Sequence, residues 1–243
     1  IGVPAGLVGA IERGPQRGLP LQAILELEQT ARLLAVLLDS GRAVINDNQT
    51  FFDDDTTGKA FPPELFERQL TDMFLGRAGA DLQDLNSAGV PDEAKRLLKE
   101  LVDVSKQVVA LAKRENSRSQ AGGTGFIPAV FGERVAGRFS AKTGVRLKQT
   151  ALVPRNPANA PDPFERSALE AFAEPSYPQE RIISEVTAKD KAIRLMFPLY
   201  TTRQCLDCHG EPRGSLDRTG YPREGLRLGQ NAGAISVILP LNK

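Results

Sequence analysis

The sequence predicts an α+β fold in which most helices precede most strands. Two observations support this prediction. Apolar residues recur at three- and four-residue steps through much of residues 21–114, which is the period of an amphipathic helix. Segments with the alternating or β-branched pattern of strands are concentrated after residue 145. Helices and strands that are segregated along the chain are typical of α+β proteins.

The N-terminal half, residues 1–122, is predicted to be helical. Residues 1–20 are rich in Gly and Pro and are expected to form an extended lead-in. The acidic run Asp53-Asp54-Asp55 is interpreted as a loop or helix cap, because the spaced ligands and bidentate Glu of a calcium loop are missing. A third helix starts well, with Pro91 followed by two acids, and we expect it to pack with the second as a hairpin. The helices are expected over residues 21–45, 63–75 and 91–114.

The C-terminal half, residues 123–243, mixes helices and strands. A Gly-rich linker at 115–125 precedes it, and a turn dense in Pro and Asn occupies 155–161. We expect the strands to be antiparallel and the two halves to form one compact unit. Helices are expected over 128–142 and 163–172, and strands over 145–153, 181–188, 191–200 and 232–239.

The composition excludes some functions. The chain has 31 basic and 30 acidic residues, which are interspersed and give a net charge of +1. There is no basic stripe, no Trp, and only three Tyr, so we expect no nucleic-acid partner. No apolar run approaches the roughly 18–20 residues that cross a bilayer, so we expect no transmembrane segment of its own.

Cys205-Leu206-Asp207-Cys208-His209 contains both cysteines and the single histidine of the chain. Cys-x-x-Cys-His is the pattern for c-type haem attachment: the thiols bond to the porphyrin vinyl groups, and the histidine binds the iron. We therefore predict one covalent haem c, with His209 as the proximal ligand. A Cys205–Cys208 disulfide and a haem-free dithiol oxidoreductase are the alternatives, whereas a structural zinc site would need a fourth ligand.

Covalent haem attachment implies maturation outside the cytoplasm, so we expect a periplasmic or otherwise extracytoplasmic location. The chain opens at Ile1 without an initiator Met, which fits removal of an export signal.

Other residues are candidates for the haem site. Met196, on the predicted strand before the motif, is a candidate distal iron ligand, with core packing as its alternative. Arg155 and Asn156 are candidates for hydrogen bonds to propionates, with stabilisation of the turn as the alternative. The remaining candidates for cofactor contact flank the motif: Phe197, Tyr200, Arg203 and Tyr221.

Several stretches also resemble a known family: residues 142–144 with 155–161, 194–200 with 205–210, and 219–225 with 229 and 233–237. Together they resemble the PAS-like, single-haem c-type domain of cyanobacterial soluble cytochromes and bacterial haem sensors, over roughly residues 123–240. The resemblance implies a PAS-like antiparallel sheet flanked by helices, a long N-terminal helix, and an inserted helical hairpin at about 67–122. One cyanobacterial member uses a cysteine as sixth ligand, but the matching segment here, residues 127–131, has no sulfur.

The motif and the resemblance together lead to a functional expectation. We expect an extracytoplasmic monohaem c-type cytochrome that transfers electrons, as a carrier or sensor rather than a catalyst. Its partner would be a redox protein or a larger membrane-associated complex. The alternative is a haem-based redox or gas sensor, and the distal ligand decides between the two.

Overall fold

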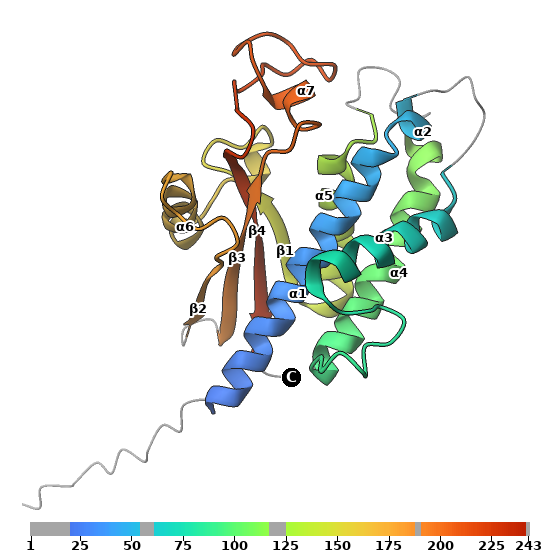
Figure 1. The fold of residues 1–243 in the computed structure, drawn as a ribbon, viewed down its shortest axis with the longest axis vertical. Helices are drawn as coiled ribbons and strands as arrows, with labels where there is room; N and C mark the ends of the chain where they lie inside the picture. The colour runs from blue at the N-terminus through green and yellow to red at the C-terminus, as the bar shows by residue number, and fades with distance from the viewer. Residues whose placement is uncertain (1–19, 54–60, 117–124, 188–190, 242–243) are drawn as a thin grey trace, which may run out of the picture.

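The computed structural model describes residues 20–53, 61–116, 125–187 and 191–241. Its centre is a four-stranded sheet with the strand order β1-β4-β3-β2, in which every neighbouring pair is antiparallel (Figure 1). The strands are β1 (Arg146–Thr150), β2 (Ile183–Thr187), β3 (Ala192–Tyr200) and β4 (Asn231–Pro240). Helices flank this sheet, so the predicted α+β fold is confirmed.

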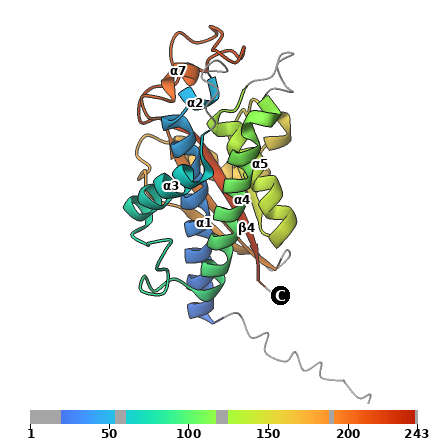
Figure 2. The same ribbon diagram turned by 90° about the vertical axis from the view of Figure 1, so that its right-hand side faces the viewer.

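Helices cover both faces of the sheet unequally. On one face, α1 (Leu21–Asp47) packs on β3 and β4, and α5 (Pro128–Thr143) packs on β1. On the side of α1 that faces away from the sheet, α3 (Pro63–Ala78) and α4 (Asp92–Asn116) contact each other and α1 (Figure 2). The short α6 (Pro163–Ala173) covers the opposite face, against β3 and β4.

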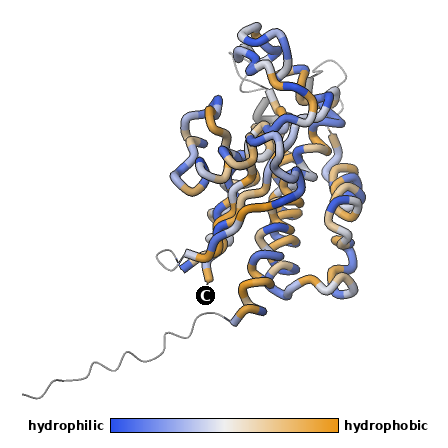
Figure 3. Tube along the Cα trace, turned by 60° about the vertical axis from the view of Figure 1, so that its left-hand side comes forward, coloured by the Kyte–Doolittle hydropathy of each residue, from blue (hydrophilic) through white to orange (hydrophobic). Residues whose placement is uncertain are grey.

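The alternation of side chains along the strands explains the two layers. Ile193 and Leu195 of β3 belong to the main hydrophobic cluster, which includes residues of α1, α3, α4 and α5. Met196, on the other face of β3, belongs to a smaller cluster beneath α6. Hydropathy follows this arrangement (Figure 3). Apolar segments lie along the strands and α1, whereas the loop between β3 and β4, at one end of the molecule, is largely polar. Residues from both halves of the chain therefore share one core.

One predicted loop contains a helical turn that the sequence pattern did not indicate. Residues Thr50–Asp53 form α2, whose Phe51 and Phe52 have ring centroids 5.2 and 5.7 Å from that of Phe61. Contacts between these aromatic rings thus stabilise a helical turn in a segment whose polar residues predicted a loop. Two of the three acidic residues, Asp54 and Asp55, lie outside the described residues.

Gly233 marks a close approach between β4 and β1, and its replacement is expected to be costly. Its φ of +135° is rarely adopted by other residues, and an added Cβ would lie 2.4 Å from the carbonyl oxygen of Thr150. We expect G233A to lower the free energy of unfolding by about 2 kcal/mol. Gly137 in α5 is the matched control, because an added Cβ meets nothing within 4 Å. Urea denaturation should find G137A at least as stable as wild type; equal losses for both variants would contradict the prediction.

Candidate functional site

The Cys-x-x-Cys-His motif lies in a long loop, residues 201–230, between β3 and β4 at one end of the molecule. Figures 1 and 2 both show its short helix, α7 (Leu206–His209), at the end that also carries α2 and the start of α5. The base of the loop is closed by backbone hydrogen bonds. Thr201 N donates to Gln230 O at 2.9 Å, and Gly229 N donates to Thr201 O at 3.0 Å. The sheet therefore fixes where the loop begins and ends.

The motif forms a single helical turn. His209 N donates to Cys205 O at 2.9 Å, and Gly210 N donates to Leu206 O at 2.9 Å. Residues three and four apart share a helix face, so Cys205 lies on the same face as Cys208 and as His209. Cys205 and Cys208 are free thiols with intermediate exposure. Gly210 allows the tight exit, since an added Cβ would lie 2.6 Å from the Leu206 carbonyl oxygen.

The imidazole of His209 is held at one nitrogen by a carboxylate. Its Nδ1 lies 2.8 Å from Oε2 of Glu224, a residue 15 positions further along the chain. Leu226 N also donates to the carbonyl oxygen of His209 at 2.7 Å, which fixes the backbone just after Glu224. A carboxylate can only accept, so Nδ1 donates this hydrogen bond, and in the neutral imidazole the free lone pair lies on Nε2.

Arg155 ties the motif to the rest of the domain from the turn that follows β1. Its Nε and Nη2 donate to the two carboxylate oxygens of Glu224 at 2.6 and 2.9 Å. Its Nη1 donates to Asp217 at 2.6 Å, and Nη2 also donates to the carbonyl oxygen of Cys208 at 3.0 Å. The guanidinium lies 5.4 Å from the ring centroid of Tyr221. One planar fork thus joins two acids and the Cys-x-x-Cys-His motif.

Asp217 is the buried anchor of this network, with a side chain that has no exposed surface. Its Oδ1 accepts hydrogen bonds from Thr219 N and Oγ1, both at 2.7 Å, and from Tyr221 N at 3.1 Å. Burial alone would raise the pKa of Asp217, but the hydrogen bonds from Thr219, Arg155 and Tyr221 hold it well below its usual range. Glu224 behaves similarly: burial acts to raise its pKa, and hydrogen bonds from Arg155 and His209 lower it.

Acid is therefore expected to weaken this loop. Carboxyl groups whose pKa is depressed by folding contribute stability above their unfolded pKa of about 4, and the contribution is lost as pH falls below it. We expect the free energy of unfolding to be lower at about pH 3 than at about pH 7. The decrease should be smaller in D217N, which removes one of the depressed groups. Urea midpoints at the two pH values measure this, and identical acid losses in both proteins would contradict the assignment.

The structure brings some of the candidate residues together. Arg155 donates to the carbonyl oxygen of Cys208 and shares the carboxylate of Glu224 with His209, and Tyr221 packs beside Arg155. Arg155 directs its donors to protein carboxylates and a carbonyl, so its predicted contact with a propionate stays a prediction. Two partners of the site, Glu224 and Asp217, were not foreseen from the sequence. The one indication of such partners in the sequence is Arg155 itself, because an arginine that becomes partly buried needs acidic partners.

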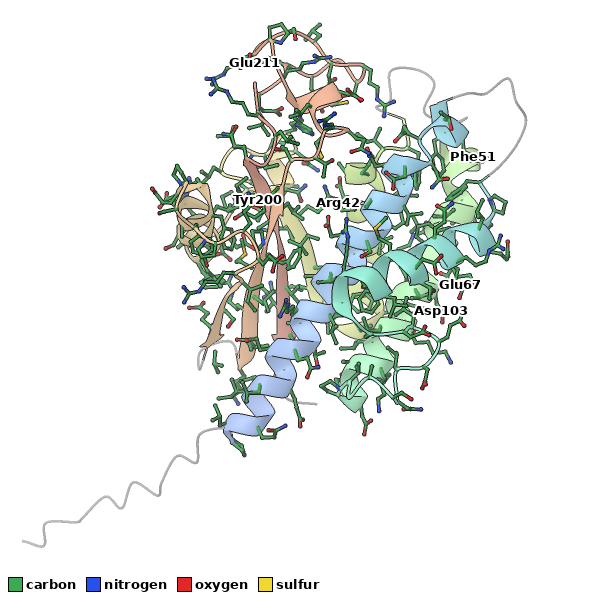
Figure 4. All side chains as sticks on the ribbon, viewed as in Figure 1. Arg42, Phe51, Glu67, Asp103, Tyr200 and Glu211 are labelled. Atoms are coloured by element: carbon green, nitrogen blue, oxygen red, sulfur yellow. The ribbon has the colours of Figure 1, made fainter. Side chains whose placement is uncertain are left out.

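The other candidates lie elsewhere or have other contacts. Asn156 accepts from Ala158 N at 3.0 Å and donates to Glu133 at 3.1 Å, as expected for stabilisation of the turn. Phe197 packs against the main cluster, and Arg203 is exposed. Tyr200 stands at the base of the loop (Figure 4), with a buried hydroxyl for which the described residues offer no hydrogen-bond partner. Burial raises its pKa, with a smaller contribution from Tyr177.

Met196 has the surroundings of a core residue. It is fully buried in the cluster beneath α6, whose members are Ala168, Leu169, Phe172, Met196 and Ala234. This is the core-packing alternative, and no contact in the structure favours iron ligation by Met196, which stays a prediction. The other methionine, Met73 of α3, is partly buried against the main cluster.

The donor set suits a covalently attached metal cofactor. Two free thiols and an imidazole whose Nδ1 is bound by a carboxylate lie on one short turn, and two thiols with a histidine are the groups that thioether attachment and axial ligation require. Within the described ranges, none of the helices is both long and apolar enough to cross a membrane.

The chain is similar to a solved structure and to a known family. A solved structure, that of the cyanobacterial heme-protein Tll0287, is 20% identical in sequence, with a TM-score of 0.41. The match covers 63% of this chain and 98% of that chain. No curated protein matches the chain. The sequence profile of the Tll0287-like family matches residues 20–240, and the chain belongs to that family.

Proposed function

We propose that this protein carries one haem c, attached through Cys205 and Cys208, and transfers electrons outside the cytoplasm. The observation that carries the proposal is that a hydrogen bond holds the imidazole ring of His209 in one orientation. Its Nδ1 is bound by Glu224 within a Cys-x-x-Cys-His turn, which leaves Nε2 for the iron. The similar cyanobacterial protein is described as a heme-protein, and we extend that cofactor to this chain.

The chain's own residues would do most of the work of holding the cofactor. Each thiol would add its sulfur and hydrogen across one vinyl double bond, so no atom leaves. Gly210 permits the sharp exit from the turn, and Arg155 holds the carbonyl of Cys208 and the carboxylate that orients His209. When bound, haem supplies a one-electron iron couple.

Location, domain type and partner follow as parts of the same proposal. Covalent haem is attached outside the cytoplasm, which supports an extracytoplasmic location for the protein. The antiparallel sheet flanked by helices supports a PAS-like domain over residues 123–243, with α3 and α4 as additions to it. We propose a redox protein or a larger membrane-associated complex as partner. The chain would serve as a carrier rather than a catalyst.

The position of Met196 favours one second candidate, a haem-based redox or gas sensor. Because this thioether is buried beneath α6, it gives no support to a sealed six-coordinate iron. Optical spectra of the matured protein with and without CO distinguish the two functions. A six-coordinate, low-spin iron in both oxidation states that resists CO supports the electron carrier. Rapid CO binding to a five-coordinate ferrous iron would overturn it in favour of the sensor.

A further inference from the structure

Glu224 is a charged acceptor in a position where a neutral carbonyl would be enough to orient a histidine. Its Oε2 lies 2.8 Å from Nδ1 of His209, while Arg155 donates to both of its oxygens. The carboxylate is therefore held from two sides and cannot rotate away without losing ion-pair contacts. Arg155 is itself anchored by the buried Asp217. The four residues form one chain of charge-assisted hydrogen bonds that ends at the imidazole.

We propose that Glu224 is the positioning residue of the haem site and that it lowers the reduction potential of the iron by strengthening His209 as a donor. This inference rests on the proposed haem attachment. An anionic acceptor draws the Nδ1 proton toward itself and leaves more electron density on Nε2. The ferric ion gains more from a stronger donor than the ferrous ion does, so the potential falls.

Arg155 limits how far Glu224 can lower the reduction potential. Its positive charge offsets part of the negative charge on Glu224, yet its fork keeps the carboxylate in place. The result is a proximal ligand with a fixed tautomer and a fixed orientation. The sequence separation of Arg155 and Glu224, 69 residues, shows that this arrangement depends on the folded domain rather than on the motif alone.

The test compares E224Q with E211Q in the matured, haem-loaded protein. Both variants remove one negative charge from the loop, but Glu211 is an exposed residue at its outer edge, where it accepts from Arg213 N (Figure 4). We expect E224Q to shift the midpoint potential to more positive values and to change the ferric EPR g values, which report on axial donor strength. E211Q should leave the g values unchanged and shift the potential much less.

The outcomes separate cleanly. Equal shifts in E224Q and E211Q would show a through-space charge effect only and would overturn the proposal, as would an unchanged E224Q. A wild-type chain that carries no haem would instead refute the proposed function. E224D, which keeps the charge and the acceptor, should stay closer to wild type in potential than E224Q; a shift as large as that of E224Q would count against the proposal.

A second measurement does not depend on haem. His209 is the single histidine of the chain, so its ring nitrogens give unambiguous NMR signals in the 243-residue chain without cofactor. We expect the neutral imidazole to be protonated at Nδ1 in wild type and mainly at Nε2 in E224A. The Nε2-protonated form in wild type would overturn the proposal.

Discussion

Serine at both motif cysteines, C205S/C208S, will abolish covalent haem attachment. Both thiols are free and half-buried on the same helical turn as His209, and the described residues hold no other cysteine. Hydroxyl groups do not form the thioether links, so the variant should lose all haem that survives denaturation. Each single variant should keep one link and one intact vinyl group. Haem staining of denatured protein and the pyridine haemochrome spectrum measure both effects.

D207N is the matched control for this experiment, because Asp207 lies between the two cysteines but is exposed. It should mature with the same haem content as wild type when both are expressed with the same export and maturation machinery. Haem that remains covalently bound in C205S/C208S would refute the assignment of both cysteines.

R155A is expected to be the most destabilising substitution in the network that holds the loop. It would leave Asp217, which has no exposed side-chain surface, as a buried carboxylate without its cation. Removing one partner of a buried pair typically costs about 3–5 kcal/mol, and Arg155 is also paired with Glu224. We expect a loss of this size in the free energy of unfolding. Urea denaturation followed by circular dichroism measures it, and faster proteolysis within residues 201–230 should accompany it.

Arg96 supplies the control for R155A. It pairs with Glu93 on the surface of α4, where both side chains are more than half exposed. Exposed pairs of this kind contribute about 0–1 kcal/mol, so R96A should lie close to wild type. R155K should be intermediate, because lysine keeps the charge but not the planar fork. If R155A were as stable as R96A, the buried network would have no role in holding the loop.

The helices and strands were predictable because their periodic apolar patterns correspond to the faces that are buried. The long first helix, for example, ends at Asp47, two residues beyond its predicted end, and buries Leu34, Leu37 and Leu38 against the rest of the core. The motif residues were predictable because Cys-x-x-Cys-His is a local pattern. The helical turn α2 was missed, since aromatic packing between separate segments decides it.

The acidic partners of the site could not be predicted in the same way. Arg155 meets Asp217 and Glu224 across 62 and 69 residues, and no local pattern encodes such a contact. Met196 shows the same difficulty within a strand. Whether it faces the motif or α6 depends on strand facing that the sequence left open, and the structure places it beneath α6.

Mass spectrometry of the exported, matured chain tests the central claim most directly. Proteolysis should yield a peptide that spans Cys205 to His209 and carries the added mass of one haem, with both cysteines resistant to thiol alkylation. The same peptide with unmodified, alkylatable cysteines, or with the two sulfurs joined to each other, would contradict the account.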